Sequence, residues 1–235
     1  MKIEEQYNRA KDNLNGRLFA PYQREGVLWM LTMENQESGP KGGFLCDEMG
    51  LGKTVQMVST MLGNPKESTL IIVPKSIITQ WVNEITKFAP KMSVHVFDGP
   101  DRKRKEADVV IMPYSLLSTH KETFIHKKNW NRIILDEAHE IRNKSSKLFK
   151  SVNRIKAEIK WIVTGTPVFN SMNDFVSLCA FLGIDKALVQ GMTNKIKDIY
   201  ILRRTKDDLA KINDRLRLPN CYFENVELDM FPDER

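Results

Sequence analysis

The fold is decided by the stretch Gly42-Gly-Phe-Leu-Cys-Asp-Glu-Met-Gly-Leu-Gly-Lys-Thr54. Its apolar run, residues 44–46, predicts a short buried strand, and a tight turn rich in glycine follows. Residues 55–62 have the composition of a helix, which Gly63 and Pro65 would close. Glycines let backbone N–H groups approach phosphate oxygens, and a helix N-terminus favours anions. The order of strand, glycine turn, Lys-Thr pair and helix is therefore the layout of a phosphate-binding P-loop.

Two side chains at the end of this turn would carry the phosphate chemistry. Lys53 would contact the β- and γ-phosphates, and the Thr54 hydroxyl would bind Mg²⁺. The rest of the cradle would be formed by Met49, Gly50, Leu51 and Gly52. The strict pattern has glycine where this chain has Asp47. From this stretch alone, an ordinary glycine turn before a helix stays open as the alternative.

A second candidate site follows an apolar strand that begins near Asn131. The strand ends in two adjacent acids, Asp136 and Glu137, with His139 close behind. The carboxyl end of a buried strand is where an open parallel α/β sheet binds ligands. We expect Asp136 to hold the Mg²⁺ shell, and Glu137 to orient and deprotonate an attacking water. The alternative is an acid that caps an ordinary helix, and the P-loop upstream makes it less favoured.

Composition places the chain among soluble globular proteins with a substantial core. Its 235 residues are 41% hydrophobic and 28% charged, and the net charge of +6 permits nucleic-acid binding without requiring it. No apolar run approaches the ~20 residues of a membrane span, and the N-terminus is no signal peptide. Cys46, Cys179 and Cys221 have no metal-ligand spacing, so we expect reduced thiols. The expected location is intracellular: nuclear in a eukaryote, otherwise cytoplasmic or viral.

Strands alternate with helices along the rest of the chain. Further strands are expected at 68–74, 93–97, 108–112, 160–167 and 222–228. Helices are expected at 1–15 (a loose one), 76–88 and 138–153, and a polar loop at 34–41. Residues 16–31 are expected to open with a proline turn and continue as an amphipathic helix, and residues 171–200 to be helical with turns at Gly183 and near Gly191. The basic run at 102–105 is expected on a solvated helix face, with a nuclear signal or a phosphate patch as alternatives. This alternation predicts an α/β fold with a mostly parallel sheet and helices on both faces, as in P-loop NTPases.

Two side chains in these helices need a choice between a core or surface position and a role in a site. The amide of Gln23 could pair with both the donor and the acceptor of an adenine edge. Its alternative is a solvated helix residue, and helical spacing alone does not separate the two. Trp81 has the spacing of a core residue rather than of a residue that stacks on a base.

Together these motifs make the chain resemble the Swi/Snf-type DNA translocases, the chromatin-remodelling branch of superfamily-two helicases. The resemblance covers about residues 16–228 and rests on Tyr22-Gln23, Asp47-Glu-Met-Gly-Leu-Gly-Lys-Thr54, Ile72-Val-Pro74, Asp136-Glu-Ala-His139, Thr164-Gly-Thr-Pro167 and Leu202-Arg-Arg-Thr-Lys206. Asp47 in place of glycine is typical of that branch. The resemblance implies the RecA-like fold of the first lobe, with ATP and Mg²⁺ as cofactors.

The resemblance also implies individual roles. Gln23 would read adenine, and the nucleotide state would be coupled to lobe movement by His139, Thr164, Gly165 and Thr166. Two loops would hold phosphates of one DNA strand: Pro74, Lys75 and Ser76 in the first, Tyr114 and Ser115 in the second. Such contacts are independent of sequence and sensitive to salt. The implied partners are double-stranded DNA, a second RecA-like lobe in the same protein, and nucleosomes or other DNA-bound proteins, but no membrane.

The same resemblance divides the chain. Residues 1–15 would be a polar N-terminal extension, 16–217 the first RecA-like lobe, and 218–235 a linker toward a second lobe that is absent from these residues. Within the lobe, 171–205 would hold a short helical insertion and the helices of the lobe junction. In this family the second lobe carries the arginine fingers, so this chain alone is expected to bind Mg-ATP and to hydrolyse it barely above background.

Two departures and two alternatives accompany this interpretation. The family has Thr-Thr-Tyr where this chain has Met112-Pro-Tyr114, and Ile-Gln-Asn where it has Val168-Phe-Asn170. The first alternative is a binding module that kept the fold without hydrolysis, and the full set of Lys53, Thr54, Asp136 and Glu137 argues against it. The second is a strand-separating helicase, which the Thr-Gly-Thr-Pro turn and the Arg-Arg-Thr-Lys segment disfavour.

Overall fold

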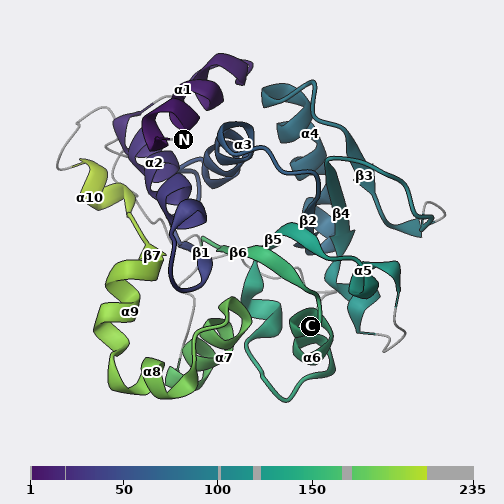
Figure 1. Cartoon of the computed structure of the whole chain (residues 1–235), viewed down its shortest axis with the longest axis vertical. Helices are drawn as coiled ribbons and strands as arrows, with labels where there is room; N and C mark the ends of the chain where they lie inside the picture. Colours follow the sequence, from purple (N-terminus) through teal and green to yellow (C-terminus); the bar gives the residue numbers. More distant parts are fainter. Residues whose placement is uncertain (1, 19, 100–101, 119–122, 166–170, 211–235) are drawn as a thin grey trace, which may run out of the picture. The chain divides into compact units, whose positions relative to one another are not determined.

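The computed structural model describes residues 2–18, 20–99, 102–118, 123–165 and 171–210 (Figure 1). The chain divides into two units, Met1–Arg204 and Thr205–Arg235. In the second unit the described residues form α10 (Lys206–Ala210). The predicted boundaries after residues 15 and 217 stay predictions. The predicted strand at 222–228, Thr166 and Cys221 lie outside the described residues.

Seven strands form one sheet in the first unit, in the order β3-β4-β2-β5-β6-β1-β7. Their bounds are β1 (Lys41–Leu45), β2 (Thr69–Val73), β3 (Val94–Val96), β4 (Val109–Pro113), β5 (Trp130–Asp136), β6 (Ala157–Val163) and β7 (Ile201–Leu202). Every pairing between them is parallel. Strands β2 and β4 are buried along their whole length, as a parallel sheet covered on both faces requires. The predicted α/β fold is confirmed.

Helices cover both faces of this sheet (Figure 1). One layer holds α1 (Ile3–Asn13), α2 (Pro21–Asn35), α3 (Lys53–Gly63) and α4 (Ile78–Phe88). The other holds α5 (Phe124–Lys127), α6 (Lys147–Asn153), α7 (Met172–Leu182), α8 (Lys186–Gly191) and α9 (Thr193–Tyr200). Short 3₁₀ helices are η1 (Lys75–Ile77), η3 (Tyr114–Leu117) and η4 (Ala138–Ile141). None of the described helices is long and apolar enough to cross a bilayer.

Alternate strand residues feed two separate cores, because successive side chains in a strand point to opposite faces. In β2, Ile71 and Val73 pack with the α2–α4 layer, whereas Leu70 and Ile72 pack with the layer that contains α6 and α7. Both cores are closed to solvent, so the sheet is a rigid support for the loops that follow its strands.

The parallel arrangement brings the loops after the strands to one edge of the sheet. In spatial order these are Tyr114 after β4, Lys75 after β2, Glu137 after β5, Thr164 after β6, Cys46 after β1 and Arg203 after β7. The motifs singled out in the sequence therefore share this edge, which is where open α/β sheets bind ligands.

Near the N-terminus, two expectations are wrong. The helix at residues 1–15 is not loose, because α1 packs on α2 and α3 and buries Gln6 and Ala10. Gln6 and Asn35 exchange amide hydrogen bonds at 3.1 and 2.8 Å. The polar loop expected from Glu34 starts later, because α2 continues to Asn35 and Glu34 is buried in an ion pair with Arg132.

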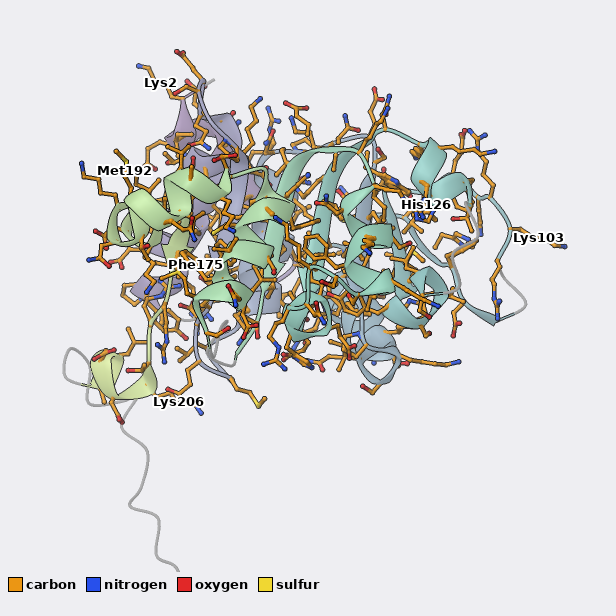
Figure 2. All side chains as sticks on the ribbon, turned by 90° about the horizontal axis from the view of Figure 1, so that it is seen from below. Lys2, Lys103, His126, Phe175, Met192 and Lys206 are labelled. Atoms are coloured by element: carbon orange, nitrogen blue, oxygen red, sulfur yellow. The ribbon has the colours of Figure 1, made fainter. Side chains whose placement is uncertain are left out.

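Two further expectations need correction. Residues 102–107 form no helix, because this basic run offers no large apolar side chain to pack; Lys103 projects outward there (Figure 2). The single helix expected at 138–153 is two short ones, η4 and α6. Asn143 Oδ1 accepts the Ser145 N–H at 2.9 Å, and Ser146 caps α6 by accepting the Phe149 N–H at 3.0 Å, so the chain turns between them. Strand β7 is too short to be visible as a pattern.

Candidate functional site

The P-loop after β1 has the backbone that its glycines predict. Gly50 and Gly52 have φ values of 89° and 75°, a conformation that side chains oppose. A Cβ atom on Gly52 would lie 2.5 Å from Nε2 of Gln23. Gly52 is the N-cap of α3, so Lys53 and Thr54 are the first two residues of that helix. The turn therefore offers main-chain donors and a helix N-terminus to an anion.

Lys53 reaches back over this turn. Its Nζ donates to the main-chain oxygens of Asp47 at 2.8 Å and Glu48 at 3.3 Å. Burial lowers the pKa of the ammonium, while the nearby carboxylates of Asp136, Asp47 and Glu137 act in the opposite direction. A Cβ atom on Gly165 would lie 3.0 Å from the same Nζ, so the turn after β6 borders Lys53. The lysine thus lies among the ends of β1, β5 and β6.

Asp136, at the end of β5, is buried and held in one orientation. Its Oδ2 accepts the indole N–H of Trp81 at 2.7 Å, and its Oδ1 accepts the N–H of Glu137 at 2.9 Å. Burial raises the pKa of this carboxyl to about 6, against the lowering effect of the Trp81 hydrogen bond. A carboxylate desolvated in this way gains from a cation.

Glu137 has a strained backbone and a carboxylate held by two neighbours. Its φ of 51° makes it the single non-glycine residue with positive φ among the described residues. Its Oε2 accepts a hydrogen bond from Thr164 Oγ1 at 3.3 Å and lies 3.3 Å from Nδ1 of His139. Two of the residues predicted to couple the site to lobe movement, His139 and Thr164, therefore contact the predicted water-activating acid.

The described residues contain no cluster of three or more His, Cys, Asp and Glu side chains that could hold a metal ion. A Mg²⁺ ion that arrives with phosphates needs only one or two protein ligands. Thr54 and Asp136 can serve as such ligands, since both lie at the edge where β1 and β5 end.

Asp47, the departure from the strict P-loop pattern, is fully buried and paired with Arg204. Arg204 donates through Nε to Oδ1 at 2.9 Å and through Nη2 to Oδ2. It also donates to Gln56 Oε1 at 2.8 Å and to the main-chain oxygen of Tyr22. Gln56 Nε2 completes the carboxylate shell at 3.1 Å. This network ties α2, the P-loop, α3 and the end of β7 together.

Main-chain bonds reinforce the same junction. The N–H of Cys46 donates to Leu202 O at 2.7 Å, and that of Glu48 donates to Arg204 O at 2.9 Å. Gly26 is necessarily small, because a Cβ atom there would collide with Gln56 and Arg204. The first half of the P-loop therefore rests on the segment that leaves the sheet at Arg204.

Tyr22 and Gln23 are buried against the P-loop from the α2 side. Tyr22 OH donates to Leu51 O at 3.1 Å, and Gln23 Nε2 donates to the same oxygen at 3.3 Å. The solvated alternative for Gln23 is excluded by its 4% exposure. The amide lies beside the phosphate turn, where the predicted adenine contact stays a prediction.

The two loops predicted to contact DNA follow β2 and β4. Lys75 is 73% exposed and lies 3.1 Å from Asp98, and Ser76 and Ser115 are exposed beside it at the same edge. Tyr114 differs, since its side chain is 3% exposed and its hydroxyl donates to Asp136 O at 3.0 Å. The Tyr114 phenol is therefore turned into the core, and the predicted contact of the Tyr114–Ser115 loop with DNA stays a prediction.

Sequence reasoning missed three contributors to the site. Trp81 was assigned to the core alone, although its indole N–H contacts Asp136. Gln56 and Arg204 were not linked to Asp47. The available signal was the acid at a P-loop position that normally has no side chain, since a buried carboxylate requires a cationic partner.

Comparisons with known proteins agree with this geometry. A family model described as the SNF2-related domain matches residues 22–192. A solved structure described as the Sulfolobus solfataricus SWI2/SNF2 ATPase core in complex with dsDNA is 32% identical, with a TM-score of 0.73, over 86% of this chain and 47% of that one.

Two curated relatives are similar at the level of sequence. An uncharacterized ATP-dependent helicase of Mycoplasma pneumoniae is 31% identical over 98% of this chain and 25% of its own length. The ISWI chromatin-remodeling complex ATPase ISW1 of Saccharomyces cerevisiae is 31% identical over 89% of this chain and 19% of its own. The chain thus spans a quarter or less of these two relatives.

Proposed function

We propose that this chain, which belongs to the SNF2-related domain family, is the ATP-binding lobe of a motor that moves on double-stranded DNA. Its membership, together with the likeness to SWI2/SNF2 ATPase cores, confirms the predicted Swi/Snf-type family and its first RecA-like lobe. The assignment of individual residues to ATP, Mg²⁺ and DNA is our proposal.

The residues present fit a magnesium nucleotide. Gly50 and Gly52 leave room where side chains would fill the turn, and α3 directs its N-terminus there. Lys53 has three ammonium protons, of which two go to neutral main-chain oxygens. Asp136 is a carboxylate whose pKa is raised by burial, so its charged form gains from a bound cation. The set combines a phosphate cradle, a cation for the phosphates and a carboxylate for the metal.

Mg-ATP, when bound, would supply the transferable phosphoryl group and the charge that neutralises its oxygens. Lys53 would bind the β- and γ-phosphate oxygens, and Thr54 and Asp136 would hold the metal. Glu137 would orient a water and accept its proton on the carboxylate. Thr164 and His139 would keep that carboxylate in place through Oε2. Tyr22 and Gln23 would fix the turn through Leu51, on the side proposed for adenine.

One observation carries this proposal above the others. The glycine turn after β1 and the acid pair after β5 flank the turn after β6, where Thr164 contacts Glu137 and Gly165 borders Lys53. A phosphate cradle and a candidate general base therefore lie on either side of one strand end. With Lys53 on one side of this strand end and Glu137 on the other, a phosphoryl group could be held between the lysine and an attacking water.

The DNA part of the proposal rests on position. Lys75 and Ser76 are exposed after β2, the strand next to β5, and Ser115 is exposed after β4, the strand beyond β2, at the same edge. A lysine and hydroxyls can contact phosphates but read no base, so the expected binding is independent of sequence. The Sulfolobus relative, solved with double-stranded DNA, supports that class of ligand.

The test is a phosphate-release assay on two proteins. The chain alone should bind Mg-ATP but release phosphate barely above background, because an arginine finger contributes ~10³ to 10⁵ in rate and a second lobe would supply it. A protein that continues through that lobe should hydrolyse ATP in a DNA-dependent way, and Glu137→Gln should abolish hydrolysis but not nucleotide binding. Failure of the longer protein to respond to DNA would contradict the motor function.

A further inference from the structure

Two buried side chains close to the loops proposed for DNA contact donate hydrogen bonds to Asp136. From α4, the helix that follows the first loop, Trp81 Nε1 donates to the carboxylate oxygen Oδ2 at 2.7 Å. From the second loop, Tyr114 OH donates to the main-chain oxygen at 3.0 Å. Both side chains are buried, with exposed fractions of 1% and 3%. Neither donor has a role in the phosphate, metal or DNA contacts proposed above.

Trp81 is joined to the first loop by continuous helix. The η1 turn begins at Lys75 and runs directly into α4, where the Ile78 N–H donates to Lys75 O. Trp81 lies in the first turn of α4, and its indole packs in the core between that helix and the sheet. Because protein cores are close-packed, a displacement of the Lys75–Ser76 loop is transmitted to the indole rather than absorbed.

Tyr114 provides the second route, and it is shorter. Its neighbour Ser115 is exposed, while the Tyr114 phenol itself is enclosed. A contact at Ser115 therefore acts on a residue that is bonded directly to the end of β5.

What these bonds hold is the peptide between Asp136 and Glu137. The carbonyl oxygen of this peptide, Asp136 O, accepts the hydrogen bond from Tyr114 OH. The N–H of the same peptide, which belongs to Glu137, donates to Val163 O at 3.0 Å and to Asp136 Oδ1 at 2.9 Å. Glu137 has φ 51° and ψ 49°, a left-handed conformation that is strained for a non-glycine residue. Such strain persists only where surrounding contacts determine it. Weakening one contact would let the Glu137 backbone relax and redirect its carboxylate.

We propose that Trp81 and Tyr114 are positioning residues that couple DNA contact at Lys75–Ser76 and Ser115 to the backbone conformation of Glu137. The inference rests on the proposed function and deepens it, since it names the route by which DNA would regulate the nucleotide site. It requires that DNA and nucleotide bind this chain with a measurable coupling. By linkage, each ligand then changes the affinity of the other by the same factor, typically about 5- to 150-fold.

The test measures the dissociation constant of a short random-sequence DNA duplex with and without the magnesium complex of a non-hydrolysable ATP analogue. The ratio of the two constants is the coupling factor. In the native chain it should differ from 1 by at least about fivefold, and in Tyr114→Phe and Trp81→Phe it should approach 1. Tyr114→Phe removes one hydroxyl and leaves no large cavity, so it remains informative if Trp81→Phe folds poorly. Trp130→Phe is the matched control, because Trp130 is equally buried and donates to Ile125 O at 3.0 Å, away from Asp136.

A second readout follows the indole itself. In a ¹⁵N-labelled chain, the Trp81 indole signal is assigned by its loss in Trp81→Phe. Addition of the duplex should shift this signal, whereas the Trp161 indole, bonded to Glu34 at 2.9 Å, should stay in place. An unmoved Trp81 signal with bound DNA would overturn the inference.

The outcomes separate this inference from the function on which it rests. If the native chain binds both ligands but Tyr114→Phe keeps the native coupling factor, the proposed route is wrong and the motor lobe stands. The same holds if the native coupling factor is 1. If the native chain binds neither the analogue nor the duplex, both the inference and the proposed function fail.

Discussion

Replacement of Arg204 by alanine should destabilise the fold strongly, although the residue lies far from Asp47 in sequence. Arg204 supplies two donors to a carboxylate that has 0% exposure, and its own side chain is 12% exposed. In Arg204→Ala the carboxylate would be left with the single amide of Gln56. Water cannot replace the guanidinium without opening the packing around the P-loop.

The expected size follows from the burial of this pair. Removing one partner of a buried ion pair costs about 3 to 5 kcal/mol. In a chain of this length, each kcal/mol lowers the melting temperature by roughly 2 to 4 °C, so the loss should be about 6 to 20 °C. The neighbouring Arg203 is exposed and gives the matched control. Arg203→Ala should stay within about 0.5 kcal/mol of the native chain.

Thermal and urea unfolding, followed by circular dichroism, measure both variants. A double-mutant cycle with Asp47→Ala separates the pair from general packing. The double variant should lose less than the sum of the two single losses, by about 1 to 3 kcal/mol. If Arg204→Ala proves as stable as Arg203→Ala, the buried carboxylate does not depend on Arg204. Our explanation of the acid in the P-loop would then be refuted.

Three other predictions concern the pH dependence of stability, a buried ion pair in the core, and the salt dependence of DNA binding. Burial raises the pKa of Asp136 from 3.8 to about 6, so its proton favours the folded chain and this contribution is lost as the pH rises through about 6. Without divalent ions, the advantage of Asp136→Asn over the native chain in urea melts should therefore grow between about pH 4 and pH 6, to at most about 3 kcal/mol, and stay level above that. An advantage that does not change across this pH range would contradict the prediction. Glu34→Ala should cost about 3 to 5 kcal/mol by thermal unfolding, because it leaves the fully buried Arg132 unpaired, and a loss below about 1 kcal/mol would exclude that role. Duplex binding measured by anisotropy should weaken with salt with a slope on the order of −2 to −4, and Lys75→Ala should make it shallower by about 1; a marked preference for one DNA sequence would contradict backbone binding.

The parts predicted well from the sequence are those with a local pattern. The glycine turn and the apolar strands each depend on residues close together in the chain, and the parallel sheet follows from their alternation. The start of α6 was not predicted, because residues 138–153 have the composition of one continuous helix. In the structure, Asn143 forms a turn and Ser146 caps α6, and together they interrupt that helix. Short-range polar competition of this kind is easily overlooked when apolar periodicity is the guide.

What sequence could not supply are partners separated by long stretches of chain. Arg204 meets Asp47 across 157 residues, and Arg132 meets Glu34 across 98. Such pairs depend on the order of strands in the sheet, which brings β7 next to β1 and seats α2 over the strands. Trp81 shows the same limit, since its spacing predicts a core residue and says nothing about the carboxylate its indole meets.

The central claim is that the turn after β1 binds Mg-ATP through Lys53, and calorimetric titration of Mg-ATP into the native chain and Lys53→Ala tests it most directly. Lys53 is the cation that this turn offers to the β- and γ-phosphates. The account predicts binding by the native chain and at least about tenfold weaker binding by the variant, a difference of about 1.4 kcal/mol. Circular dichroism should show that Lys53→Ala keeps the fold. Equal affinities of the two proteins, or no binding by the native chain, would contradict the claim.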